Sequence, residues 1–450
     1  MAMGAGAGRA PLESALRKAR WRILPLLSMC YLVAYMDRAN ISFAAESMNR
    51  DLHFSPHVYG LGAGLFFVSY ALCEVPSNLL LLKFGARRWL ARIMFTSGAL
   101  AMAMLLVHSQ KTFYGMRLLL GVAEAGYFPG AVYFLSLWFP AKERARAIGL
   151  FYVSLPLSSV VMGSAAGALL RLDGRLGLHG WQWLFLVEGM PAVLLSAAIW
   201  FTLSERPRTA RWLNQDEREA LEAELEDAHP TGDTHRWKAL KIVLRDARVW
   251  LLGLCGLCLL GSNYAQNFFL PEILRKATGA SAANVGYLIA LAAAAGAVAM
   301  IVNGIHSDRT RERRWHVVVP ALMMALLMLC AGSHLEGWTA AVILLVAFPV
   351  FFAMQAPWVA IVTELFRGER AALTIATVNM LGIVGGFLGP YWMGWMREVT
   401  GGYGVGLGSL CVPWLVMGAC IAWVTRPRVR KVTSADEKML NVAPELVDES

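Results

Sequence analysis

The sequence predicts an all-α membrane protein with twelve transmembrane helices in two pseudo-symmetric halves of six. Of the 450 residues, 57% are hydrophobic and 16% are charged, whereas about 25% of the residues of an ordinary soluble domain are charged. The apolar residues gather into stretches of about 20 residues, the length of a helix that crosses a bilayer. Short sequences of the first half also recur in the second half. These observations argue against a water-soluble fold.

The apolar stretches define two predicted halves, residues 22–203 and 248–425. The candidate spans of the first half are 22–42, 59–82, 89–107, 113–137, 145–170 and 184–203. Those of the second half are 248–272, 285–305, 315–334, 338–362, 371–395 and 404–425. Residues 1–21 and 426–450 are predicted as tails and 204–247 as a linker, in which 214–228 form a short acidic helix lying in water.

An even number of spans puts both termini on one side of the bilayer. Most of the 41 Lys and Arg residues then fall in segments on that side, and the positive-inside rule makes it the cytoplasmic side. This topology accounts for the net charge of +10 without a nucleic-acid partner. The polar, basic start of the chain has no apolar core or cleavage site, so we expect no signal peptide.

Seven cysteines all lie in apolar stretches, which argues against a secreted disulfide framework. Cys255 and Cys258 have no His or further Cys nearby at ligand spacing, so we expect no metal site.

An internal repeat relates the two halves. The Arg-Arg-Trp sequence of residues 87–89 recurs at 313–315, and the Glu-Arg-Ala sequence of 143–145 recurs at 369–371, at the same offset. Repeated halves in parallel orientation are typical of carriers whose substrate site forms near the bilayer midplane, between the halves.

Charged residues inside the predicted spans are the candidates for chemistry, because each costs about 2.5–3.5 kcal/mol there. The first half carries Asp37, Arg38, Arg117 and Glu124. Glu74 lies near a span end, where a structural role is favoured and a transport role stays open. We therefore assign any proton chemistry to the first half.

The second half supplies polar side chains that do not titrate. These candidates for substrate binding are Asn263, Gln266, Gln355 and Asn379. Asn263 occupies the position in the second half that Asp37 occupies in the first. A residue that titrates is thus matched by one that does not. Tyr35, Tyr70 and Trp358 are further candidates, although aromatic side chains in helices commonly only pack.

Arg117 and Glu124 are seven residues apart, so they share a helix face and lie about 10 Å apart along the axis. This spacing suits an Arg that binds an anion and a Glu that exchanges a proton. Asp37 and Arg38 are about 100° apart on their helix. The alternative for all four residues is a structural ion-pair network within the membrane.

Three segments resemble the major facilitator superfamily, and more narrowly its anion:cation symporters, which include sialin-like, vesicular glutamate and bacterial sugar-acid carriers. They are residues 35–42 (Tyr-Met-Asp-Arg-Ala-Asn-Ile-Ser), 117–126 and 207–221. The resemblance implies that Asp37 and Glu124 bind protons, that Arg117 contributes to carboxylate binding or coupling, and that Tyr35 and Tyr70 line the cavity. Arg38 is the next candidate for the anion site.

The loop at residues 304–314 looks like the superfamily's gating motif, in which Asp308 and Arg309 would bridge cytoplasmic helix ends. The first-half copy keeps Arg87 and Arg88 but has Leu82 in place of Asp and Asn78 in place of Gly. The resemblance therefore implies an asymmetric gate.

Together, the residues and the resemblance predict a proton-coupled importer of a small organic carboxylate, such as a sugar acid, a tartrate-like acid or an aromatic acid. We expect alternating access, a bacterial inner membrane, a monomer, and no cofactor beyond the coupling proton. An exchanger or uniporter of the same fold without proton coupling is the leading alternative, and a sensor that does not transport is a remote one. An enzyme is not expected, because the spans lack a plausible nucleophile with a base or a metal cluster.

Overall fold

The computed structural model describes residues 9–226, 243, 245–333, 337–365 and 369–426, and within these ranges the secondary structure is entirely helical. The first half contains α2 (Arg9–Leu52), α3 (Pro56–Phe84), α4 (Ala86–Ala103), α5 (Gln110–Glu124), α6 (Tyr127–Ser136), α7 (Ala141–Tyr152), α8 (Ser154–Leu170) and α9 (Gly180–Thr202). Short 3-10 turns follow α4 (η1, Met104–Leu106), α8 (η2, Arg175–Gly177) and α9 (η3, Pro207–Thr209). The linker contributes α10 (Gln215–Glu226).

The second half contains α12 (Ala247–Thr278), α13 (Ala282–Thr310), α14 (Arg314–Ser333), α15 (Gly337–Ala353), α16 (Gln355–Glu364), α17 (Glu369–Thr400), α18 (Gly404–Ser409) and α19 (Cys411–Val424). The bounds of α13 follow those of α3 at the offset of the sequence repeat, and both helices have 29 residues. The predicted pseudo-symmetry is therefore present in the helices themselves.

Eleven helical segments of the described chain are long and apolar enough to cross a membrane. They coincide with the second to twelfth predicted spans within a few residues; the last runs from Gly404 to Val424. Helix α2 is absent from this set because Asp37, Arg38 and Asn40 lower its hydropathy. Helix α2 covers the first predicted span, so together with these eleven segments it is consistent with the twelve predicted transmembrane helices.

Several spans consist of two helices joined at a break. Helix α5 ends at Glu124, and α6 begins after Gly126, whose φ of 85° is left-handed. A residue with a Cβ is strained in this conformation. The Ser77 hydroxyl donates to the Ala125 carbonyl oxygen at 2.5 Å and satisfies one backbone group that the break frees. The break places Glu124 at the end of α5. A second break, at Met354, places Gln355 at the start of α16.

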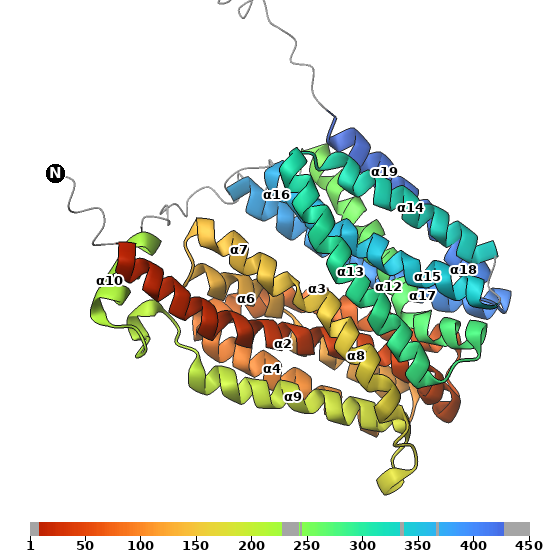
Figure 1. Ribbon diagram of the computed structural model, residues 1–450. Helices are drawn as coiled ribbons and strands as arrows, with labels where there is room; N and C mark the ends of the chain where they lie inside the picture. The colour runs from red at the N-terminus through yellow and green to blue at the C-terminus, as the bar shows by residue number, and fades with distance from the viewer. Residues whose placement is uncertain (1–8, 227–242, 244, 334–336, 366–368, 427–450) are drawn as a thin grey trace, which may run out of the picture.

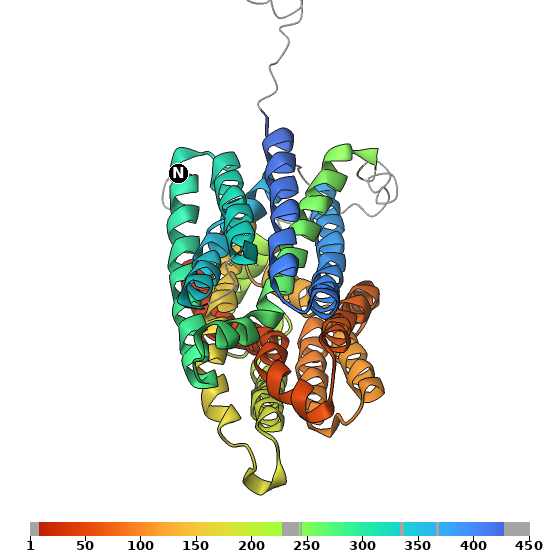
Figure 2. The same ribbon diagram turned by 90° about the vertical axis from the view of Figure 1, so that its right-hand side faces the viewer.

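The two halves meet mainly at the end of the bundle opposite the start of α2. There Arg275 pairs with Glu46 at 3.2 Å, and the Ser55 hydroxyl donates to Glu398 at 2.7 Å, both across the halves. Figure 1 shows α8 and α13 side by side toward this end, whereas α7 and α16 stand apart toward the other. In Figure 2, the helices from α12 onward lie mainly above those of the first half. We call the end that carries Glu46 and Arg275 the closed end.

Two predicted boundaries differ from the structure. Helix α2 begins at Arg9, inside the predicted tail of residues 1–21. The linker helix α10 does not simply lie in water: Glu217 on it accepts hydrogen bonds from Ser14 (2.7 Å) and Lys18 (2.8 Å) of α2, and Leu221 is fully buried. Docking of α10 explains why α2 continues beyond the predicted span. The tail after Arg426 and residues 227–242 and 244 of the linker lie outside the described residues.

Candidate substrate cavity

A cavity of about 110 Å³ lies between the two halves. Helices α2 and α8 line it from the first half, and α12, α13, α15 and α16 line it from the second. Within the described chain, Arg38 is the one charged side chain of the lining. The polar side chains around it are Tyr35, Ser42, Ser159, Asn263, Tyr264, Asn267 and Gln355. One cation among neutral polar groups suits a small anion that also carries hydroxyl groups or other polar substituents.

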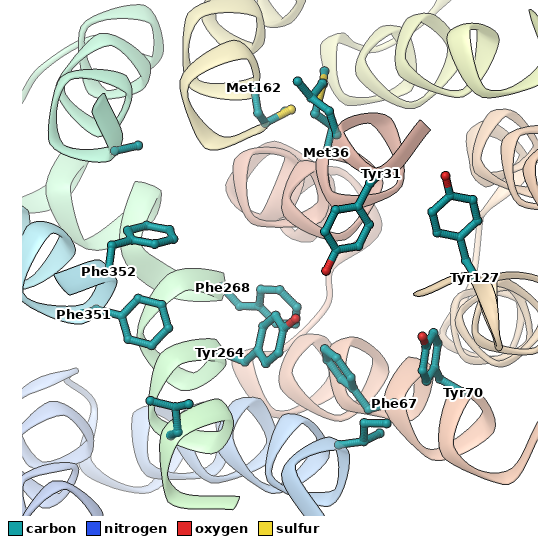
Figure 3. Close-up of a cluster of buried hydrophobic side chains, with 14 of the residues drawn as sticks. Tyr31, Met36, Phe67, Tyr70, Tyr127, Met162, Tyr264, Phe268, Phe351 and Phe352 are labelled. Carbon is teal, nitrogen blue, oxygen red and sulfur yellow. The ribbon is translucent and has the colours of Figure 1, made fainter. Parts of the chain in front are cut away.

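Aromatic side chains from both halves form the apolar part of this region (Figure 3). Phe67 of α3 packs against Tyr264 of α12, with ring centroids 4.5 Å apart, and Tyr264 contacts Phe268 of the same helix. Phe351 and Phe352 of α15 face the cavity from the second half. These apolar walls exclude water and strengthen the electrostatic attraction between Arg38 and an anion.

A second cavity, of about 260 Å³, lies at the closed end. Ser42, Phe43 and Pro271 line both cavities. A thin partition formed by α2 and α12 therefore separates the central cavity from the space beyond it.

Arg38 is held by a buried carboxylate and by aromatic rings. Its Nε donates to Glu124 Oε2 at 2.9 Å, and the two side chains are 13% and 1% exposed. The guanidinium carbon lies 5.2 Å from the centre of the Tyr35 ring and 4.8 Å from that of Tyr70. The residue thus faces the cavity on one side and Glu124 on the other.

Asp37 lies behind Arg38 and does not line the cavity. Its Oδ1 accepts a hydrogen bond from the Asn40 amide at 3.1 Å, and its carboxyl group is within hydrogen-bonding reach of that of Glu124. The structure therefore brings the two predicted proton carriers together, although they lie on different helices.

Arg117 does not line the cavity in this conformation, and its role in anion binding stays a prediction. It is 1% exposed and donates to the backbone carbonyl oxygens of Gly62 (3.4 Å) and Ala63 (3.3 Å). The charges of Asp37 and Glu124 act on it from the other side. In this conformation Arg117 lies beside the acidic cluster and joins α5 to α3, and Arg38 faces the cavity.

The second-half candidates divide into two groups. Asn263 and Gln355 line the cavity, and Asn263 accepts a hydrogen bond from Asn267 at 2.6 Å. Gln266 and Trp358 are buried, 4% and 6% exposed, and are not part of the lining, nor is Tyr70 of the first half. The sequence shows that these helices carry polar residues, but it does not show which of the residues face the cavity.

Asn379 is the partner of Glu74, not part of the cavity. Its amide donates to Glu74 Oε1 at 3.2 Å, from α17 to α3. This hydrogen bond joins the halves on the side of the cavity away from the closed end. Glu74 thus has a polar partner in the other half, and its role, structural or in transport, stays a prediction.

The predicted gating residues bond within their own halves in this conformation. Asp308 pairs with Arg313 at 2.5 Å, and Arg313 also pairs with Glu364 at 3.1 Å, all in the second half. The Arg87 backbone N–H donates to Glu205, at the start of the adjoining linker, at 3.0 Å. Arg88 and Arg309 are exposed. The described gating residues therefore do not bridge the halves here.

Glu188 is a buried acidic residue that the sequence analysis missed. It lies on α9, inside the predicted span 184–203, and is 5% exposed. The charge of Asp37 acts on it, and the Asn40 side chain lies within hydrogen-bonding reach. The rule that singled out the other intramembrane charges would have found it. Within the described chain, no group of His, Cys, Asp or Glu side chains is arranged to hold a metal ion.

The fold agrees with comparisons against known proteins. The sequence model of the Major Facilitator Superfamily matches residues 27–390 and 252–446. The chain belongs to this superfamily. A solved bacterial homolog of the human lysosomal transporter Spinster, in an inward-facing and unoccupied conformation, superposes with a TM-score of 0.71 at 20% identity and covers 90% of this chain and 94% of that chain. Membership makes the chain a transporter and not an enzyme.

Two curated superfamily members are considerably more similar in sequence. A putative tartrate transporter of Agrobacterium vitis is 41% identical over 397 residues, which cover 87% of each chain. The putative metabolite transport protein NicT of Pseudomonas putida is 39% identical over 397 residues, which cover 85% of this chain and 88% of that protein. The similarity thus extends over both halves and the linker.

Proposed function

We propose that this superfamily member imports a small organic carboxylate together with protons by alternating access. One observation carries the proposal: the only described charged side chain that lines the cavity, Arg38, is paired with a buried carboxylate, Glu124, at 2.9 Å. A substrate carboxylate that binds Arg38 must compete with Glu124. The similarity to a putative tartrate transporter supports the choice of an organic acid.

Proton coupling follows from the cost of leaving Glu124 without its partner. An unpaired buried carboxylate destabilises a protein by about 3–5 kcal/mol, which corresponds to a factor of roughly 100 to several thousand in binding. A proton on Glu124 removes this cost and leaves Arg38 free for the substrate. Substrate and proton therefore bind together, and neither binds well alone.

Alternating access would move this cluster between the two sides of the membrane. We propose that both termini are cytoplasmic and that the protein resides in a bacterial inner membrane, as the distribution of basic residues favours. The closed end then faces the periplasm, and the conformation described here is the inward-facing one. We keep the monomer as the expected oligomeric state.

Proteoliposomes that contain the full chain test the proposal, with radiolabelled tartrate as the first probe and with sugar acids, dicarboxylates and aromatic acids in a thermal-shift panel. We expect at least one carboxylate to stabilise the protein and to accumulate only when the pH gradient drives protons inward. A stabilising acid at 100 times its dissociation constant contributes about 2.7 kcal/mol. Accumulation that ignores the gradient would replace symport by anion exchange, and a panel without binders would overturn the carboxylate class.

A further inference from the structure

Glu188 is an intramembrane acid that the proposed coupling of Arg38 and Glu124 does not use. Its helix, α9, does not line the cavity, so the carboxyl group cannot contact a substrate there. Both of its oxygens are buried and have no hydrogen-bond partner within 3.5 Å in the described part of the chain. A residue of this kind is costly if it is ionised, because a buried charge without a partner loses its hydration without compensation.

Asn40 lies between Glu188 and Asp37. Its amide nitrogen donates to Asp37 Oδ1 at 3.1 Å, which leaves its Oδ1 turned away from Asp37. That oxygen is buried and also has no partner among the described residues. The Asn40 side chain also lies within hydrogen-bonding reach of the Glu188 carboxyl group, and in the described part of the chain the acceptor atoms of both side chains lack a donor.

A proton on Glu188 supplies the missing donor. The protonated carboxyl group can donate through its O–H to Asn40 Oδ1 while Asn40 continues to donate to Asp37. The chain of hydrogen bonds then runs from Glu188 through Asn40 to Asp37. The reverse orientation of the Asn40 amide would leave Asp37 without its donor.

Among the residues that the structure describes, the helices packed against α9 offer no cation to Glu188. Helix α9 packs against α2, α4, α8 and η1. Helix α8 and η1 carry no charged residue. On α4, Gly98 faces α9, whereas Arg92 lies over Trp89 and donates toward the Ala123 carbonyl oxygen of α5. From α2, the charged group that acts on Glu188 is the carboxyl group of Asp37, not a cation.

The charges of the whole cluster also indicate that Glu188 lacks a cation. Asp37, Glu124 and Glu188 are three acids, and Arg38 and Arg117 are two cations that remain protonated in proteins. The cluster is electrically neutral with one proton on its acids. Glu124 is paired with Arg38, and the charge of Arg117 acts on Asp37, so Glu188 is the acid left without a cation.

We propose that Glu188 is a third proton-binding carboxyl of this cluster, protonated while the cavity is empty and joined to Asp37 through Asn40. The assignment deepens the proposed function, since a transport role for this proton rests on symport. The protonation itself does not depend on transport.

Infrared spectroscopy of the full chain in lipid membranes without substrate tests the proposal, because protonated carboxyl groups have a C=O stretching band that ionised ones lack. At neutral pH, the Glu188→Gln variant should lose the band of one carboxyl group, while the more conservative Glu188→Asp variant should retain a shifted one. The matched control is Glu46→Gln, which removes a carboxylate paired with Arg275 and should leave the neutral-pH band unchanged.

A band unchanged by both Glu188 variants would overturn the proposal, because Glu188 would then be ionised in the empty protein. Failure of Glu188→Gln to fold would also count against it, since a neutral, nearly isosteric side chain should replace a protonated one. The proposed function is tested separately, by uptake of tartrate in proteoliposomes. Uptake that does not respond to the pH gradient would contradict symport, but it would not affect the infrared evidence for a protonated Glu188.

Discussion

Arg38 Nε and Glu124 Oε2 lie 2.9 Å apart, in an ion pair between neighbouring helices whose cation alone borders the cavity. The pair lies inside the first half, so it can persist while the halves move relative to each other. Binding of an anion would break it on any side of the membrane. This arrangement links the charge of the substrate to the protonation of Glu124.

Replacement of Arg38 by Lys should lower substrate affinity more than it lowers protein stability. A lysine ammonium keeps the charge but lacks the planar fork that binds a carboxylate at two points. We expect a loss of about tenfold or more in affinity, equivalent to about 1.4 kcal/mol. Thermal-shift titration of the variant with the acid that stabilises the wild type measures this loss, and unchanged affinity would show that Arg38 does not bind the anion.

Replacement of Arg117 by Lys should have the opposite pattern. Arg117 donates to Gly62 and Ala63 carbonyl oxygens and is 1% exposed, so its loss disturbs the contact between α3 and α5. We expect a lower thermal stability, by roughly 1–3 kcal/mol, with the change in substrate affinity smaller than for Arg38→Lys. A variant with normal stability and lost binding would restore Arg117 as the anion site.

Contact between the halves at the closed end depends on a close approach of α8 and α13 at Gly167. A Cβ at this residue would lie 2.2 Å from the Ala283 Cα atom, so Gly167→Ala should push the helices apart. Overpacking costs of about 1–3 kcal/mol would lower the population of the closed-end state by roughly 5- to 150-fold relative to the other state.

Spin labels at the exposed residues Leu176 and Val399 measure this shift as a longer distance across the closed end. Gly115→Ala is the matched control, because an added Cβ there meets nothing within 4 Å. Equal distance distributions for the two variants would contradict the role of the α8–α13 contact.

Docking of α10 on α2 should weaken in acid. Burial alone would raise the pKa of Glu217, but hydrogen bonds from Lys18, Ser14 and the Asn214 backbone outweigh it and lower the pKa. A lowered pKa contributes stability above the ordinary Glu range, and this contribution is lost as the pH falls through the folded value.

The Glu217→Gln variant should therefore exchange the amide hydrogens of α10 about fivefold faster at neutral pH, for a local loss of about 1 kcal/mol. The exposed Glu224→Gln change on the same helix should have no such effect. Equal exchange in the two variants would show that Glu217 does not hold the linker.

The spans were predictable because each needs only a local run of apolar residues, as the agreement at Gly404–Val424 illustrates. The cavity was less predictable, because the side chains that face it depend on the rotation of each helix. Asn263 and Gln355 reach it while Gln266 does not. The sequence spacing indicated that Arg117 and Glu124 do not pair directly. It could not reveal that Glu124 pairs with Arg38 of another helix.

Long-range partners were beyond sequence reasoning for the same reason. Glu74 and Asn379 come from different halves, and their contact exists only in one arrangement of those halves. The docking of α10 was missed because its acidic composition is typical of a solvated helix, although Leu221 is fully buried. Glu188 was visible in the sequence as a charge inside a span and was overlooked.

The most direct test of proton coupling is the transport of the Glu124→Gln variant in proteoliposomes. Gln mimics the protonated acid in shape and neutrality, so it frees Arg38 permanently and removes the proton from the cycle. The account predicts that accumulation driven by a pH gradient is lost while exchange of labelled for unlabelled substrate across the membrane survives. A variant that still concentrates substrate against its gradient at the wild-type level would contradict it.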